Sequence, residues 1–230
     1  MKRLHFLVEG PTEREFVDSV LVDHFVAKGI YCDARVVTTS HDWSSGRVYK
    51  GGIVSYSRVK NEIVNSIRQD CGPGSYFTTS FDLYGLPTDF PGMSGSMPTD
   101  HKRLAECIES ALLSDIKSAL PSVDVPSIFV PNVLCHEFEA LVLSDVSKLA
   151  NYYFDRKDAI ADLSRQVDEV GDPELVDSGV ESAPSKRILR VIPEYDKSTA
   201  GALIALDIGL QSLRARCARF NAWITRLEAI

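Results

Sequence analysis

The chain has 230 residues, a formal net charge of −7 and 44% hydrophobic residues, which is typical of one soluble α/β domain or of a domain with a helical appendage. The acidic balance disfavours a protein that coats nucleic acid through bulk positive charge. It is compatible with a nuclease, because an acidic metal site adds negative charge of its own.

The first predicted strand ends in a carboxylate. The apolar run Leu4–Val8 indicates a buried strand, and Glu9 stands where that strand stops. A helix is predicted over residues 12–29, where apolar side chains recur every three and four residues, and Thr12 with Glu15 fits a capping box at its start. Glu9 either caps the turn between the two elements or faces a cleft.

Strands and helices continue to alternate along the chain. Residues 40–57 and 85–100 are rich in glycine and polar residues, so both are predicted as irregular loops, the first with room for a short hairpin. The other predicted elements are a strand at 33–39, a helix at 58–70, a strand from 75 that ends at Asp82, a helix at 101–116 and a strand at 127–133.

This order predicts an α/β fold, with a parallel sheet of about four strands flanked by helices. We assign residues 1–145 to this α/β core and residues 146–230 to a helical C-terminal extension, because strand patterns fade from about residue 146. The last predicted helix has an apolar stripe that is too short for a coiled coil, and we expect this stripe to pack on the core. The stripe consists of Leu213, Cys217, Phe220, Ile224 and Leu227.

Carboxylates are predicted at the ends of two strands. Functional side chains gather at the C-terminal ends of parallel strands, where Glu9 and Asp82 stand. Glu13 either joins them or is favoured in the first helical turn by the helix dipole alone. Clustered carboxylates resist ionising together, and a divalent cation relieves that cost. Mg²⁺ prefers oxygen ligands, so we expect Mg²⁺, or Mn²⁺ as an alternative, to bind Glu9 and Asp82.

Three polar residues follow the fourth predicted strand. If the segment is helical, Glu137 and Glu139 point about 200° apart, whereas in an extended segment they share a face. We expect Glu137 to join the metal ligands and at least one of the two glutamates to be structural. His136 is either a ligand or, more commonly for a lone histidine, a hydrogen-bonding residue.

Two further segments are candidates for binding nucleic acid. "APSKRI" places Lys186 and Arg187 beside a predicted helix start, where cations oppose the helix dipole unless a phosphate binds there, and the alternative is a solvated surface pair. Lys197, in "PEYDKSTAG", is a weaker candidate of the same kind. The aromatic loop "FDLYGLPTDFPG" either offers a platform for bases or for a partner, or packs on itself.

The segment "LVEGPTE", with the later strand-ending aspartate, resembles the Toprim domain of topoisomerases, primases and OLD-type nucleases. The resemblance implies a parallel α/β fold with a glutamate after the first strand and acids after a later one. Toprim domains usually have an Asp-x-Asp pair, whereas Asp82 is followed by Leu83 and Tyr84, and Asp89 lies too far along. Either another acid substitutes or the second metal is absent.

A longer resemblance covers nearly the whole chain. "FDLYGLPTDFPG", "HEFEALVLSD", "APSKRI", "PEYDKSTAG" and "FNAWITRLE" resemble the bacterial Toprim-like family catalogued as domain of unknown function four-two-seven-six. That resemblance implies similarity to nuclease halves of two-part systems whose other half is an ABC- or AAA-type ATPase, and an association with defence against phage. The chain has no Walker-type GxxxxGK[ST], so any ATP hydrolysis must come from another protein.

Two hypotheses from different classes follow. The first is a metal-dependent nuclease acting on DNA or RNA, with Glu9, Glu13 and Asp82 as catalytic carboxylates and Lys186 or Arg187 steadying the phosphate. The chain has no room for the DNA gates and tyrosine-bearing domain of a topoisomerase. The second is a non-catalytic module that binds or regulates a partner ATPase.

The remaining sequence signals concern location and redox state. No apolar run reaches membrane-spanning length and no secretory signal is visible, so we expect a cytoplasmic protein with no membrane partner. The five cysteines are scattered without a CxxC pair, which predicts reduced, buried thiols rather than disulfides or a zinc site.

Overall fold

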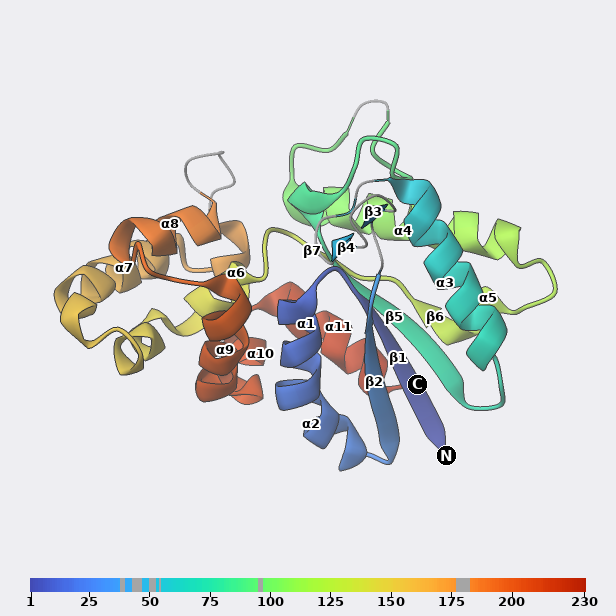
Figure 1. Ribbon diagram of the computed structural model, residues 1–230, viewed down its shortest axis with the longest axis horizontal. Helices are drawn as coiled ribbons and strands as arrows, with labels where there is room; N and C mark the ends of the chain where they lie inside the picture. The colour runs from blue at the N-terminus through green and yellow to red at the C-terminus, as the bar shows by residue number, and fades with distance from the viewer. Residues whose placement is uncertain (38–39, 43–46, 50–52, 54, 95–96, 177–182) are drawn as a thin grey trace.

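The structure is a computed structural model that describes residues 1–37, 40–42, 47–49, 53, 55–94, 97–176 and 183–230. Its centre is a parallel sheet in the order β2–β1–β5–β6, with β7 also paired to β5 (Figure 1). The predicted α/β fold with a parallel sheet is therefore confirmed. The strands of this sheet are β1 (Lys2–Val8), β2 (Ile30–Val36), β5 (Ser75–Asp82), β6 (Phe129–Val130) and β7 (Val133–Leu134).

The first helix differs from its prediction at the start. It runs from α1 (Pro11–Phe16) through a π-helical turn, η1 (Val17–Leu21), into α2 (Val22–Val26). Gly10 is the N-cap residue and no side chain caps the helix, so the predicted capping box is wrong. Proline lacks an N–H group and favours the first helical turn, and Pro11 therefore starts the helix one residue early.

The fourth predicted strand is divided. A short helix, α5 (Val125–Ile128), precedes β6, and Pro131 and Asn132 separate β6 from β7. Pro131 has no N–H group to donate to the neighbouring strand. The side chain of Thr79 on β5 supplies hydrogen bonds where the strand is interrupted. Its hydroxyl donates to the carbonyl of Asn132 and accepts from the N–H group of Asn132, both at 2.9 Å.

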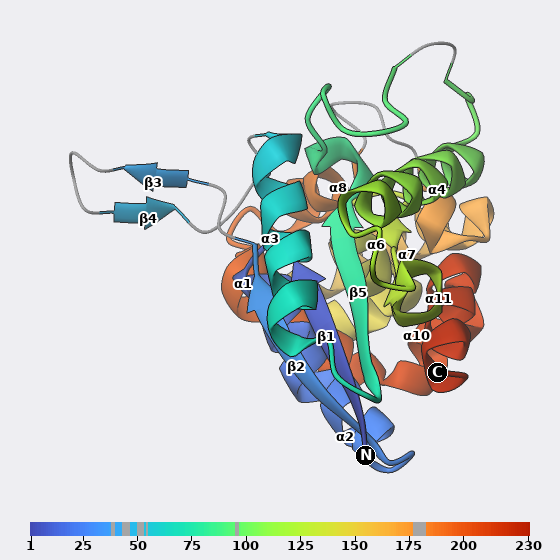
Figure 2. The ribbon, with the colours of Figure 1, turned by 90° about the vertical axis from the view of Figure 1, so that its right-hand side faces the viewer.

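Helices cover both faces of the sheet, and each face has its own apolar core. On one face lie α3 (Tyr56–Asp70) and α4 (His101–Ala119), seen on either side of β5 in Figure 2. Their buried residues, including Ile63 and Ile108, pack with Phe77 of β5. On the other face, α1 and α11 (Ala218–Glu228) pack with Phe6 of β1.

The C-terminal residues are helical and share the second of these cores. The Trp223 indole of α11 donates to the Thr78 hydroxyl of β5 at 2.9 Å, and its ring meets the edge of Phe6 at 5.9 Å. The C-terminal elements are α6 (Glu139–Val142), η3 (Leu143–Asn151), η4 (Phe154–Arg156), α7 (Lys157–Val170), η5 (Pro173–Leu175), α8 (Pro184–Val191), η6 (Lys197–Gly201), α9 (Ala202–Ile208), α10 (Leu210–Arg216) and α11.

All five residues of the predicted apolar stripe are buried, but the stripe lies on two helices. Cys217, with φ −112° and ψ 95°, has extended backbone angles and separates α10 from α11. All cysteines are free; Cys135 and Cys217 are buried as predicted, whereas Cys71 and Cys107 are exposed.

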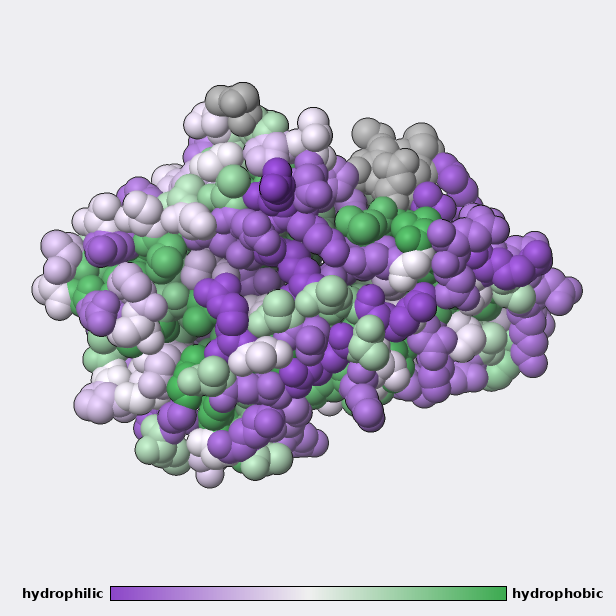
Figure 3. Space-filling model, turned by 180° about the vertical axis from the view of Figure 1, so that it is seen from behind, coloured by the Kyte–Doolittle hydropathy of each residue, from purple (hydrophilic) through white to green (hydrophobic). Residues whose placement is uncertain are grey.

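The loops and the outer surface complete the fold. The predicted loop at 40–57 contains an antiparallel hairpin of β3 (Ser40–Asp42) and β4 (Arg47–Tyr49), which projects from the body of the molecule (Figure 2). Hydrophilic residues predominate on the face seen in Figure 3, and hydrophobic residues occur in separate patches. No helix in the described part of the chain is long and apolar enough to cross a membrane.

Candidate active site

Two acidic residues meet at the C-terminal edge of the sheet. β1 and β5 are parallel neighbours, with Val8 paired to Ser80, so both strands end at the same edge. Glu9 follows the end of β1 and Asp82 is the last residue of β5. The backbone N–H group of Asp82 donates to Oε2 of Glu9 at 3.2 Å, and the two residues therefore lie side by side.

Two glycines allow the backbone to approach these carboxylates closely. A Cβ atom on Gly85 would lie 2.9 Å from Oε1 of Glu9, and one on Gly10 would lie 2.9 Å from Oε2 of Glu13. A larger residue at either position would displace the carboxylate. Gly10 and Gly85 therefore make room for the carboxylates of Glu13 and Glu9.

A lysine from the C-terminal part of the chain lies among the carboxylates. Nζ of Lys197, in η6, is 3.4 Å from a carboxylate oxygen of each of Glu13, Asp82 and Glu139. We call Glu9, Glu13, Asp82 and Glu139 the acidic cluster. Its members come from the end of β1, from α1, from β5 and from the start of α6.

Burial dominates the electrostatics of the acidic cluster. The side chains of Glu139, Glu13 and Asp82 are 0%, 6% and 9% exposed, against 36% for Lys197. Burial raises the pKa of Glu9 and Glu139, and it raises that of Asp82 well above its usual range, where the neighbouring glutamates add to the shift. These carboxyl groups therefore hold protons more strongly than ordinary ones.

The pKa of Lys197 is raised, although burial by itself would lower it. Burial alone would lower the pKa of this ammonium group, but the nearby carboxylates, led by Asp82, outweigh it and raise the pKa above 10.5. Lys197 is therefore positively charged throughout the physiological range. Its positive charge thus lies among the four carboxyl groups of the acidic cluster.

The acidic cluster opens into a cavity of about 300 Å³. Glu9, Glu13 and Lys197 all line the cavity, so both signs of charge reach it. The cavity is lined by Glu9, Gly10, Pro11, Thr12, Glu13, Asp196, Lys197 and Ser198.

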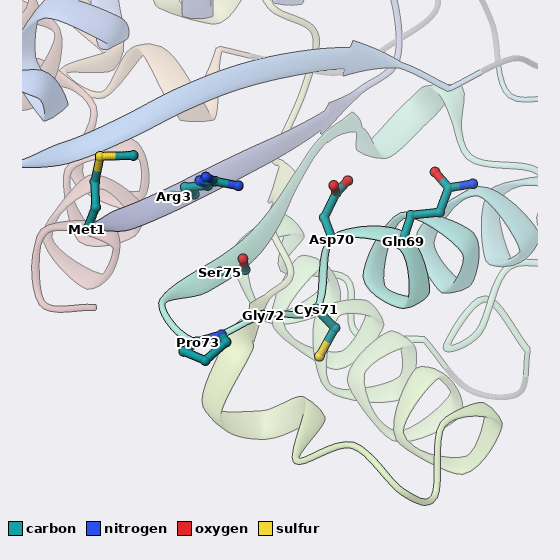
Figure 4. A pocket seen from close by; sticks show the side chains of 8 residues that line it. All are labelled: Met1, Arg3, Gln69, Asp70, Cys71, Gly72, Pro73 and Ser75. Carbon is teal, nitrogen blue, oxygen red and sulfur yellow. The ribbon is translucent and has the colours of Figure 1, made fainter.

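A larger cavity, of about 400 Å³, lies at the opposite end of the sheet, where β1 and β5 begin (Figure 4). Figure 4 shows Arg3 projecting from β1 and Gln69 and Asp70 from the end of α3. Asp70 supplies the one carboxylate among the described residues that line it, and this carboxylate is already paired with Arg35 at 2.7 Å. The smaller cavity is therefore the better candidate for chemistry.

The acidic cluster has donor atoms of the kind that Mg²⁺ prefers. Oδ1 of Asp82 and Oε1 of Glu139 are buried and accept no hydrogen bond, and hard carboxylate oxygens suit this ion. Within the described ranges, no group of three or more His, Cys, Asp or Glu forms a ready metal site. The residues thus fit Mg²⁺ in kind, and Lys197 holds the position between the carboxylates.

The two glutamates after the fourth strand have different surroundings. Glu139 reaches the acidic cluster, whereas Oε2 of Glu137 accepts a hydrogen bond at 3.0 Å from the N–H group of Ser185, in the first turn of α8. Glu137 therefore satisfies a helix start. Asp89 likewise accepts from the N–H group of Tyr56 at 3.2 Å, at the start of α3.

The three basic residues that the sequence suggested for phosphate binding lie in different places. Lys197, ranked lowest, contacts the acidic cluster. Lys186 is exposed and Arg187 is half-buried on the first turns of α8, where Glu137 links the helix start to the segment that leads into Glu139. His136 is buried and stacks on Tyr84 with ring centroids 5.6 Å apart.

The comparisons with known proteins give one family and one structure. The family described as "Domain of unknown function (DUF4276)" matches residues 8–228. The solved C-terminal region of the Burkholderia pseudomallei OLD protein is 17% identical, covers 98% of each chain and has a TM-score of 0.43, too low to specify a fold or an activity. No curated protein matches the chain.

Proposed function

The chain belongs to the family described as domain of unknown function DUF4276, and we propose that it is a metal-dependent nuclease that hydrolyses phosphodiester bonds. The observation that carries this proposal is the meeting of three buried carboxylates and a charged lysine, at 3.4 Å, at the C-terminal edge of a parallel sheet. Clefts at this edge are where open α/β sheets bind ligands.

Mg²⁺ or Mn²⁺ would be held by Glu9 and Asp82, with Glu137 as predicted from the sequence or Glu139 as its position favours. When bound, the metal activates water and neutralises the charge that develops on the phosphate. A divalent cation would also relieve the repulsion among these buried acids.

The side chains have separate roles in the proposed reaction. Glu13 lines the cavity and is placed to orient the attacking water. Burial raises the pKa of Glu9, so its carboxylate accepts a proton more readily than an ordinary carboxylate does. Lys197 is partly exposed and would donate to a phosphate oxygen, since ammonium–phosphate hydrogen bonds are charge-assisted. Lys186 and Arg187 would hold the flanking backbone of the substrate.

We extend the proposal to a nucleic-acid substrate and an ATPase partner. The acidic chain lacks a nucleotide-binding GxxxxGK[ST] loop, and its motifs resemble nuclease halves that work with ABC- or AAA-type ATPases. Anti-phage defence by such a pair is the context that this resemblance suggests.

A non-catalytic module that binds or regulates a partner ATPase is the second candidate. The observation that favours it is the neutralisation of the acidic cluster by Lys197, which gives these carboxylates a counterion without any metal. The missing Asp-x-Asp pair points the same way.

Cleavage assays distinguish the two candidates. Mixed DNA and RNA substrates are incubated with Mg²⁺, Mn²⁺ or EDTA, with and without the product of the neighbouring gene. We expect metal-dependent cleavage that is lost in Glu9→Gln and Asp82→Asn and retained in Asp70→Asn, a matched change at the opposite end of the sheet. Partner binding without cleavage under any condition supports the module instead.

A further inference from the structure

One large aromatic side chain beside the acidic cluster is exposed. Tyr84 lies in the turn η2 (Leu83–Gly85), two residues after Asp82, and is 50% exposed. Phe90, from the same loop, is only 2% exposed and packs against Phe81. Self-packing of this loop, one of the two sequence-based alternatives, therefore describes Phe90 but not Tyr84.

The Tyr84 ring is held from two sides. One face stacks on His136, with ring centroids 5.6 Å apart and planes at 9°, and His136 itself is 1% exposed. The Tyr84 hydroxyl and Nε2 of His101 are hydrogen-bonded at 3.1 Å. The rings of His101 and His136 meet edge to face at 5.2 Å. A ligand that stacks on Tyr84 would meet a ring whose orientation is already ordered.

The strand register attaches this ring to the acidic cluster. Asp82 pairs with Leu134 between β5 and β7, and Tyr84 and His136 each follow one of these paired residues by two positions. The residue after Tyr84 is Gly85, whose backbone lies against the Glu9 carboxylate. The segment that carries the ring therefore also contacts the acidic cluster.

We propose that Tyr84, backed by His136 and His101, is a stacking platform for one unpaired base of a single-stranded nucleic acid whose phosphate lies at the acidic cluster. The inference rests on the proposed phosphodiester chemistry and names its substrate class. Every base has a π-face, so such stacking tolerates any sequence. A base inside a duplex has both faces covered by its neighbours, and the platform therefore selects single strands.

The test is equilibrium binding of fluorescent DNA and RNA oligonucleotides of equal length, single-stranded or duplex, with Ca²⁺ replacing Mg²⁺ and strand integrity checked on a gel. Tyr84→Ala is expected to raise Kd for single strands about tenfold and to change Kd for duplexes little. Tyr84→Phe keeps the ring and should bind like the parent. The matched control is Tyr31→Ala, because Tyr31 is 51% exposed at the start of β2.

An abasic scan makes the test position-specific. Replacing one base at a time along the strand should identify a position where the parent loses affinity and Tyr84→Ala does not. Tyr84→Leu, which keeps an apolar cover over His136, replaces the alanine variant if that protein does not fold.

The outcomes separate this inference from the function on which it rests. Equal affinities of the parent, Tyr84→Ala or Tyr84→Leu, and Tyr31→Ala for single strands overturn the platform alone. A parent that binds neither single strands nor duplexes overturns the platform together with the nuclease proposal. A tenfold loss confined to Tyr84 and to single strands supports the platform.

Discussion

The backbone amide of Asp82 donates a hydrogen bond to the carboxylate of Glu9, so the ends of β1 and β5 are joined through a side chain at the point where their ladder stops. This contact orients Glu9 toward the acidic cluster rather than toward its own turn. The amide oxygen of a glutamine at position 9 could accept the same hydrogen bond. A Glu9→Gln substitution therefore removes the charge of Glu9 and keeps this contact.

Glu9→Gln should leave the metal-free protein as stable as the parent or slightly more stable. The substitution retains an acceptor for the Asp82 amide and removes one of the repelling carboxylates. The rise in Tm that Mg²⁺ gives the parent should be lost. Thermal unfolding with EDTA and with increasing Mg²⁺ measures both effects, and an unfolded variant that still binds metal would show that Glu9 is a structural cap.

Lys197→Met should destabilise the metal-free protein by on the order of 2 kcal/mol. Removing one partner of a fully buried ion pair typically costs more, and the partial exposure of Lys197 screens part of the effect. Mg²⁺ should restore much of the loss, because it supplies another counterion. Urea unfolding with and without Mg²⁺ checks this.

Lys148→Met is the control for this experiment. Nζ of Lys148 is also 3.4 Å from a carboxylate, that of Asp207, and its side chain is 32% exposed, but Asp207 is its single carboxylate partner in the described part of the chain. A small loss without any Mg²⁺ recovery is expected. An equal loss of stability and an equal Mg²⁺ response in the two variants would mean that the acidic cluster does not bind Mg²⁺ in place of Lys197.

The metal-free protein should become less stable as pH rises above the ordinary carboxyl range. Asp82, Glu9 and Glu139 have raised pKa values, so the folded state binds more protons than the unfolded state between their ordinary values, 3.8 for Asp and 4.5 for Glu, and the raised ones. The free energy of unfolding therefore falls as pH rises through that window.

Asp82→Asn isolates this effect from the other titrating groups. Glu228, whose pKa is lowered to about 2 chiefly by its bond to Arg214, gives the opposite slope at lower pH in both proteins. The difference between parent and variant in urea unfolding from pH 4 to 8 should grow with pH. Parallel curves would show that the Asp82 carboxyl is not perturbed.

Changing both Lys186 and Arg187 to alanine should weaken nucleic-acid binding and spare the Mg²⁺ response. Both residues stand on the first turns of α8, and we expect their cations to act on the phosphates of the substrate backbone rather than on the metal. Filter binding at several salt concentrations should show a shallower salt dependence. Lys117→Ala, an exposed lysine on α4, is the control, and identical binding by all three proteins would assign the pair to the solvated surface.

The sequence predicts the sheet and the two strand-end acids well, because the evidence for them is local. An apolar run followed by Glu9 or Asp82 predicts both the strand and the residue at which it ends. The register then brings the two together without any further information.

Lys197 and Glu139 are harder to predict. Lys197 is 115 positions from Asp82 in the chain, and nothing local indicates which of three basic candidates will meet the cluster. The choice between Glu137 and Glu139 depends on the backbone between β7 and α6, which bends before the helix begins at Glu139. The "DKS" turn, in which Asp196 accepts from the Ser198 amide at 3.0 Å, is the one local signal that Lys197 occupies an ordered position.

Helix α11 has a consequence for how the protein is made. A ribosome releases β1, β2 and β5 long before residues 218–228 exist, so the part of the sheet that Trp223 covers stays in contact with water until α11 has been made. The α3–α4 side closes earlier, since its helices lie next to β5 in the chain. Although α1 already packs on this face, the part that α11 covers stays exposed until residues 218–228 have been made, and chaperones that bind apolar surfaces would have their longest access there.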